Sequence, residues 1–338
     1  MISREDFRKL VKSNRASIYN VTHIADFDGM GSAAMLMHYA GVPKERIFFG
    51  NYMRQAIDRI IEELNAAKLH NSLIIFTDMG VNDSTIETLK GLLHWLKDKG
   101  NKVAWIDHHP WNDTAVREIG GECAYLVAGE NKNYCATELV YKELFENEAD
   151  TEYGMNLANI AHYADFNIRN EQLDPLLFEI TGAITYINYN QGNIARLRDL
   201  VSEFAKGNYK NGITKEAYAN YLKDSELSIK ELEESLEKHS IGNLTLGIGY
   251  SKRLGSTQAC AIIADELKAD IAIFVNTDSR KVSLRSDKAV DCSKLAIALG
   301  GGGHPQASGC EVNAESGEDW KELFSARVLE EAAKIYGR

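Results

Sequence analysis

The first half of the 338-residue chain alternates short apolar runs with stretches in which apolar residues recur at helical spacing. The apolar runs are rich in Val, Ile and aromatic residues, which is typical of strands. Strands that alternate with helices predict a mostly parallel sheet with helices on both faces. We expect strands at 18–24, 46–52, 72–79, 102–108 and 123–127, and helices at 31–39, 54–67, 84–97 and 136–146.

The strand pattern stops near residue 153 and returns near residue 241. Between these points, residues 194–204 and 215–238 have helical spacing, and the second stretch is highly charged, as expected for a solvated connecting helix. Later strands are expected at 244–250, 271–276 and 281–285, and later helices at 258–268, 292–299 and 319–336. We therefore predict an α/β protein with a larger N-terminal domain (1–190), a helical linker (191–240) and a smaller α/β C-terminal domain (241–338).

Acidic residues and histidines stand where three of the expected strands end. His23, Asp26 and Asp28 lie at the end of the first strand, Asp78 at the end of the third, and the triplet 107–109 (Asp-His-His) at the end of the fourth. Parallel strands present such residues at one edge of the sheet. Few Lys or Arg residues are nearby, so converging carboxylates would repel one another or stay protonated.

Bound divalent cations resolve this repulsion, and we predict a metal site. Carboxylate and imidazole ligands without thiolate suit manganese, iron, cobalt or zinc, and suit magnesium less well. With Asp165, which follows a later helical stretch, the donors exceed the needs of one ion, whereas two ions ~3.5–4 Å apart with a bridging Asp would use them all. Such a pair can clamp a phosphoryl oxygen and hold a hydroxide, which predicts metal-assisted hydrolysis of a phosphate ester or anhydride.

A run of four glycines at 300–303 precedes His304. Consecutive glycines are unfavourable inside a helix or strand, so we expect a loop whose backbone N–H groups approach an anion. The alternative is a flexible turn. Arg285, at the end of an expected strand, is suited to a bidentate contact with phosphate, and the alternative for this residue is a surface salt bridge.

On these motifs the sequence resembles the DHH family of phosphoesterases. The Asp-His-His triplet, the segment 23–29, Asp78 and Asp165 occur in the family's order. The glycine run with His304 is similar to the GGGH-type motif of the subgroup that contains RecJ-like exonucleases and oligoribonucleases, and it argues against the inorganic pyrophosphatase branch. The sequence departs from the family where its first histidine precedes the Asp-x-Asp motif by three residues, since two or four are more common.

The resemblance implies a role for each matching residue. The metal ligands would form two sets that share one residue: His23, Asp26 and Asp78 at one ion, and Asp28, Asp78, His108 and Asp165 at the other. His109 would be a catalytic residue beside the attacked phosphate, and Asp107 would orient its neighbours. The substrate's phosphate or terminal nucleotide would be bound, at an active site in the cleft between the domains, by Arg285, Gly302, Gly303 and His304.

The implied activity is that of a metal-dependent phosphodiesterase that removes 5′-mononucleotides from single-stranded or short RNA or DNA. Of two divalent ions, manganese is expected first, with cobalt, magnesium or zinc as alternatives. The formal net charge of −11 opposes nonspecific binding to long duplexes and favours short oligonucleotides. Two alternatives stay open: a phosphodiesterase for cyclic or linear dinucleotides or nucleoside bisphosphates, and a non-catalytic adaptor that binds nucleic acid or a repair partner.

The five cysteines are scattered and odd in number, so we expect no disulfide framework and a reducing cytoplasm. The first residues lack the apolar core of a signal peptide, and no apolar run approaches the ~18 residues of a membrane span. A cytoplasmic protein without membrane contact is therefore expected. The sequence leaves open the choice of RNA or DNA, the polarity of cleavage, the substrate length and the oligomeric state, a homodimer included.

Overall fold

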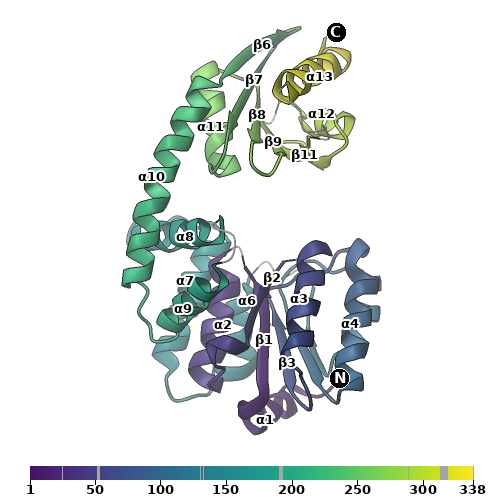
Figure 1. Cartoon of the computed structure of the whole chain (residues 1–338), viewed down its shortest axis with the longest axis vertical. Coiled ribbons are helices and arrows are strands. Elements are labelled where there is room, and N and C mark those ends of the chain that lie inside the picture. Colours follow the sequence, from purple (N-terminus) through teal and green to yellow (C-terminus); the bar gives the residue numbers. More distant parts are fainter. Residues whose placement is uncertain are drawn as a thin grey trace. The chain divides into compact units, whose positions relative to one another are not determined.

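The computed structural model describes residues 1–24, 26–51, 54–129, 131, 133–189, 193–287, 289–312 and 319–337. The chain divides into two compact units, Met1–Tyr221 and Leu222–Arg338, and Figure 1 labels many of their helices and strands. The division falls within the predicted linker 191–240, and helix α10 (Gly212–Glu234) runs through it. The predicted boundary between residues 190 and 191 lies outside the described residues.

A five-stranded parallel sheet in the order β2-β1-β3-β4-β5 forms the centre of the first unit, as predicted. Side chains alternate between its faces, so that Leu73 and Ile75 enter one hydrophobic cluster and Ile74 and Phe76 enter the other. Tyr52, in the expected strand 46–52, lies outside the described residues. The strands are β1 (Ile18–His23), β2 (Ile47–Gly50), β3 (Leu73–Thr77), β4 (Lys102–Ile106) and β5 (Tyr125–Val127).

Helices cover both faces of this sheet, as Figure 1 shows. One face packs against α3 (Arg54–Ala66), α4 (Ile86–Asp98) and α5 (Asp113–Gly120). The cluster on the other face includes residues of α1 (Arg4–Ser13), α2 (Phe27–Ala40), α6 (Ala136–Val140), α7 (Thr151–Asp165), α8 (Asp174–Tyr189), α9 (Ile194–Phe204) and the start of α10. Because both faces are covered, the strands are nearly continuous apolar runs.

The second unit has a six-stranded mixed sheet in the order β10-β11-β9-β8-β7-β6, in which only β7 and β8 are parallel. One face packs on α12 and α13, and the other on α11 and the end of α10. The elements are β6 (Glu237–Ile241), β7 (Leu244–Ser251), α11 (Ser256–Leu267), β8 (Ile271–Asn276), β9 (Lys281–Ser286), α12 (Ser293–Ala298), β10 (Gly302–His304), β11 (Ala307–Glu311) and α13 (Trp320–Tyr336).

Two predictions about the second unit are wrong. The helix expected to continue to residue 238 ends at Glu234, because the polar residues after it pair with β7 as the edge strand β6. The glycine run, expected as a loop, contributes Gly302 and Gly303 to β10, which pairs with β11. In both cases pairing with a neighbouring strand outweighs weak local strand propensity.

In the described part of the chain, no helix combines the length and the hydropathy that crossing a lipid bilayer requires.

Candidate metal centre

The carboxyl edge of the first sheet gathers most of the acidic and histidine residues singled out above. His23 is the last residue of β1, Asp78 directly follows β3, and the triplet 107–109 directly follows β4. These three strands are adjacent and parallel, so their ends meet. Asp165, the last residue of α7, reaches the same place, because its Oδ2 lies 3.8 Å from Nε2 of His108.

One group of ligand atoms comes from His23, Asp26 and Asp78. Nδ1 of His23 lies 2.7 Å from Oδ2 of Asp26 and 3.7 Å from Oδ2 of Asp78. Asp26 is the N-cap of α2, and its Oδ1 accepts a hydrogen bond from the Gly29 N–H. Residue 29 has to be glycine, because a Cβ there would lie 2.4 Å from the carbonyl oxygen of His23. The histidine's three-residue spacing from Asp26 thus still brings the two side chains together.

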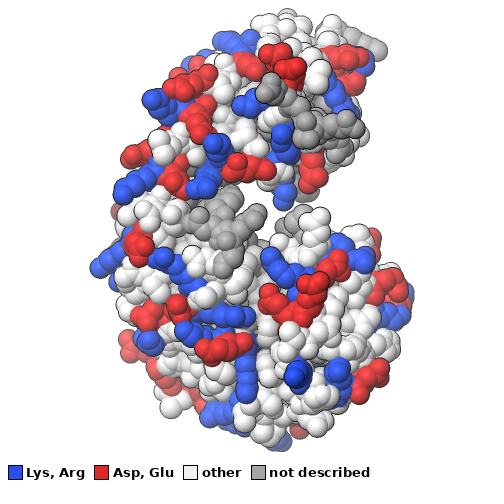
Figure 2. Space-filling view, in the orientation of Figure 1, with Lys and Arg blue, Asp and Glu red and all other residues white. Residues whose placement is uncertain are grey.

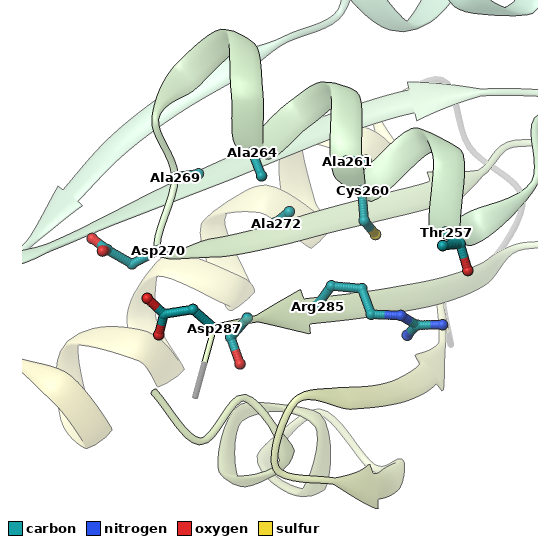
Figure 3. A pocket seen from close by; sticks show the side chains of 10 residues that line it. Thr257, Cys260, Ala261, Ala264, Ala269, Asp270, Ala272, Arg285 and Asp287 are labelled. Atoms are coloured by element: carbon teal, nitrogen blue, oxygen red, sulfur yellow. The ribbon is translucent and has the colours of Figure 1, made fainter. Parts of the chain in front are cut away.

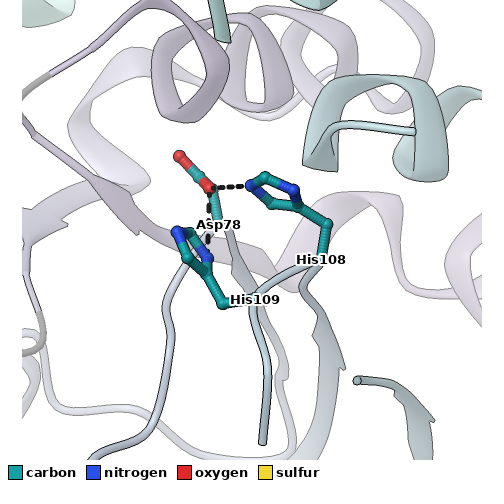
Figure 4. Close-up of side chains that lie close together, drawn as sticks. All are labelled: Asp78, His108 and His109. Carbon is teal, nitrogen blue, oxygen red and sulfur yellow. Dashed lines mark ion pairs between the residues drawn. The ribbon is translucent and has the colours of Figure 1, made fainter. Parts of the chain in front are cut away.

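A second group of ligand atoms comes from Asp28, His108 and Asp165. Nε2 of His108 lies 3.8 Å from Asp28 Oδ2 and 3.5 Å from Asp78 Oδ1. Asp78 therefore turns one carboxylate oxygen toward each group. Figure 4 shows the Asp78 carboxylate between His108 and the neighbouring His109.

The ligand atoms of each group lie close enough together that they could hold a divalent cation. Two ligand atoms each ~2.1 Å from one ion and 90–120° apart lie roughly 3.0–3.6 Å from each other, close to the distances around His108. Asp78 Oδ2 and His108 Nε2 are buried and have no hydrogen-bond partner among the described residues. Buried polar atoms are rarely left without a partner, so these two atoms point to a ligand. The backbone of Asp78 has φ +55°, in the left-handed region that few non-glycine residues adopt and that Asp and Asn tolerate best.

The pKa values of the carboxyl groups reflect how closely these acidic side chains are crowded together. Burial, followed by the charges of Asp28 and Asp26, raises the pKa of Asp78 well above its ordinary value. Burial also raises the pKa of Asp28. Partial burial and the charge of Asp28 raise the pKa of Asp165 to about 6. Asp26 differs: burial is again the largest single cause and raises its pKa, but the hydrogen bond and charge of His23 and the Gly29 N–H together outweigh burial and lower the pKa. The carboxylates thus resist full ionisation unless cations join them.

We expect the stability of the metal-free protein to fall as the pH rises from 5 to 8. A carboxyl group whose pKa is raised on folding stabilises the fold below its unfolded pKa, ~3.9, and this contribution is lost as the pH rises through the folded value. For Asp165 that folded value is about 6, and it is raised for Asp28 and Asp78 too. Thermal unfolding in a chelator should show the fall, and Mn²⁺ should raise the melting temperature more at pH 8 than at pH 5. An unchanged melting temperature across this range would contradict the crowding described here.

Asp107 and His109 form a separate pair beside the two groups. Asp107 is fully buried, and its Oδ1 accepts a hydrogen bond of 2.8 Å from Nδ1 of His109. Its Oδ2 accepts from the His109 backbone N–H and from Nε1 of Trp111. The hydrogen bond with Asp107 is the main cause that raises the pKa of His109. Because Nδ1 carries the proton that Asp107 accepts, Nε2 is the ring nitrogen of His109 that this pair does not use.

Two supporting contacts were not found from the sequence. The Asp28 carboxylate accepts hydrogen bonds from the backbone N–H groups of Ala136 and Thr137, at the start of α6. Glu138 accepts a hydrogen bond from His162 of α7, so a further histidine is fixed near the site. The chain separation between α2 and α6 hides the first contact, although an Ala-Thr-Glu helix start after 135 is visible in the sequence.

Three predicted substrate-binding residues lie on one face of the second sheet. Across antiparallel strands, opposite residues share a face. Arg285 of β9 lies opposite Ala307 of β11, which lies opposite His304 of β10. Gly302 lies on the same face two residues before His304, and a Cβ there would meet no atom within 4 Å. Packing therefore does not require a glycine at 302, and the surface there is open.

Gly303 is constrained by its backbone, whereas Arg285 is held by a side-chain hydrogen bond. Gly303 has φ +135°, and a Cβ there would lie 2.6 Å from the Cα of Ser308, so the backbone itself requires glycine. The Arg285 guanidinium donates a hydrogen bond to the carbonyl of Leu284. Among the described residues no carboxylate forms an ion pair with Arg285, so the salt bridge considered as its alternative is not found there.

Comparison with known proteins gives two family matches. The DHH family, N-terminal domain, matches residues 17–166, and the DHHA1 domain matches residues 249–331, which together are more than half of the chain. Oligoribonuclease NrnB of Bacillus subtilis (strain 168) is 25% identical in an alignment 333 residues long that covers 92% of this chain and 76% of that protein.

Two solved structures have a similar fold. RecJ from Thermus thermophilus in complex with Mn²⁺ gives a TM-score of 0.60 at 16% identity, over 98% of this chain. This chain spans 55% of that RecJ chain. An exopolyphosphatase-related protein from Bacteroides fragilis gives a TM-score of 0.52 at 15% identity, over 99% of this chain and 97% of that one.

Proposed function

The chain belongs to the DHH family of phosphoesterases, and on this premise we propose that it is an exonuclease dependent on two divalent metal ions. Its substrates would be single-stranded or short oligonucleotides, which it hydrolyses to 5′-mononucleotides. The observation that carries the proposal is Asp78, whose two carboxylate oxygens face two separate groups of ligand atoms. The relative named as an oligoribonuclease supports the choice of substrate, and the Mn²⁺ complex of RecJ supports the choice of metal.

The ligands of the two ions would be the two groups described above. One ion would be held by His23, Asp26 and Asp78, and the other by Asp28, Asp78, His108 and Asp165. When bound, such a pair supplies a nucleophilic hydroxide and neutralises charge on the scissile phosphate. The mixed carboxylate and imidazole donors suit manganese, iron, cobalt or zinc, and among these we propose manganese, the metal of the RecJ complex described above.

The remaining residues of the site would position the substrate and handle protons. With Nδ1 held by Asp107, His109 would present Nε2 to the phosphate and stabilise its charge or transfer a proton. In the second unit, Arg285, Gly302 and His304 share an open face on which phosphate and sugar would bind, with Gly303 shaping the strand.

The test is hydrolysis of end-labelled RNA and DNA of two, five and twenty nucleotides with Mn²⁺, Co²⁺, Mg²⁺ or Zn²⁺. We expect stepwise release of 5′-mononucleotides, fastest from the short substrates because the net charge is −11. Hydrolysis of dinucleotides alone would favour a dinucleotide phosphodiesterase. Binding without hydrolysis under every metal would contradict the proposal and favour an adaptor.

Replacing Asp107 with asparagine should reduce turnover by about 10- to 100-fold, as is typical when an outer hydrogen-bond partner of a metal site is lost. The side-chain amide of the Asp107→Asn protein can turn its NH₂ group toward Nδ1 of His109. The side chain at 107 would then no longer hold the His109 proton on Nδ1. Steady-state kinetics should show the loss in kcat, while the bound metal measured by elemental analysis stays unchanged. Loss of metal from the Asp107→Asn protein would instead make Asp107 a ligand.

A further inference from the structure

A cavity in the second unit lies beside the face that carries Arg285. Its volume is about 340 Å³, within the range of small-molecule sites. Figure 3 shows it between helix α11 and the strands β8 and β9. Arg285 lies opposite Ala272 of β8, so the row that contains His304 and Arg285 leads directly to this cavity.

The walls of the cavity are made of small side chains. Cys260, Ala261 and Ala264 of α11 recur at helical spacing, and Ala272 of β8 faces them. Figure 3 shows the side chains of Cys260 and Ala264 directed from the helix toward the strands. Because these walls lack large side chains, the space between them suits a flat group that makes van der Waals contact with both sides.

The two ends of the cavity differ in charge. Figure 3 shows the Arg285 guanidinium directed toward the end near Thr257, in the first turn of α11, where the helix dipole also favours an anion. The carboxylates of Asp270 and Asp287 lie at the opposite end. Each accepts one backbone hydrogen bond, from Thr245 and Ala289 respectively, through one of its two oxygens. A second oxygen in each can accept from a ligand.

We infer that this cavity binds the base of a nucleotide whose phosphate contacts Arg285. The base would lie between the α11 alanines and the Arg285 stem, and its amino group would donate to Asp287. The aliphatic stem of Arg285 offers the base an apolar surface, and its guanidinium, which has no carboxylate partner among the described residues, is available for the phosphate. This inference rests on the proposed function and adds to it a base-binding site in the second unit.

The test is calorimetric binding of AMP and of ribose 5-phosphate, which lacks the base, to the full-length protein. The wild type should bind AMP about tenfold more tightly, since base stacking contributes ~1–3 kcal/mol. Ala261→Leu fills the cavity from an exposed position of α11 and should weaken AMP binding about tenfold without changing ribose 5-phosphate binding. Glu266→Leu adds the same side chain on α11 outside the cavity lining and serves as the control. Asp287→Asn should weaken the binding of AMP and leave the binding of ribose 5-phosphate unchanged.

Equal affinity of the wild type for the two ligands would overturn the inference. An equal loss of affinity for AMP and for ribose 5-phosphate in Ala261→Leu would also overturn it, because the substitution would then affect phosphate binding or folding and not the base. Hydrolysis of bis(p-nitrophenyl) phosphate in Mn²⁺ by the wild type tests the metal centre without the AMP comparison, and the control Glu266→Leu should hydrolyse it at the same rate. Failure of that reaction in the wild type would therefore contradict the proposed function, whereas the AMP comparison would still decide the base site.

Discussion

Substituting Asp78 should abolish turnover. Its two oxygens face the two groups of ligand atoms, so Asp78→Ala removes a ligand from both ions at once. The loss should exceed the ~100-fold that removal of an outer partner causes, because the nucleophile and the charge neutralisation are lost together. Steady-state hydrolysis of a five-nucleotide RNA in saturating Mn²⁺ measures this effect.

A second variant separates lost chemistry from lost folding. Asp78 has φ +55°, which strains alanine but suits asparagine. Asp78→Asn should therefore fold, and without metal at pH 8 it should melt at a higher temperature than the wild type, because one crowded charge is gone. Asp98→Asn, on the exposed end of α4, is the matched control and should leave activity unchanged. Near-normal Mn²⁺-dependent hydrolysis by Asp78→Asn would refute the bridging role.

Removing divalent metal should reduce turnover about as much as Asp78→Ala does. Dialysis against a chelator should reduce hydrolysis to background, and Mn²⁺ should restore it, because the other groups near the scissile phosphate cannot replace a metal-activated hydroxide. Mn²⁺ should also raise the melting temperature of the wild type and should do so less for Asp78→Asn, since one shared ligand is lost. Full activity in protein shown by elemental analysis to hold no metal would contradict the proposal.

Much of the first unit could be predicted from the sequence because its strands are buried on both faces. The apolar runs at 72–79 and 102–108 correspond to β3 and β4, and the pattern of strands and helices correctly predicted the parallel sheet. In such a sheet the strand ends meet, so Asp78 and the triplet 107–109 could be expected at one edge before any coordinates.

The features that were not predicted depend on contacts between distant segments. β6 is polar because it is an edge strand. Its side chains alternate between exposed and partly buried, and none is fully buried, so its sequence resembles the end of a charged helix. The strand in the glycine run forms because Gly303 pairs with Ser308 of β11, and glycine permits this pairing since a Cβ there would lie 2.6 Å from the Cα of Ser308. The Asp28 carboxylate accepts hydrogen bonds from Ala136 and Thr137, which are more than one hundred positions away in the sequence. No local sequence pattern indicates this contact.

The most direct test of the metal centre is anomalous X-ray scattering from crystals of the wild-type protein grown with Mn²⁺. We predict two manganese peaks ~3.5–4 Å apart, with the Asp78 carboxylate bound to both. A single peak, or two peaks that do not share Asp78, would contradict the account.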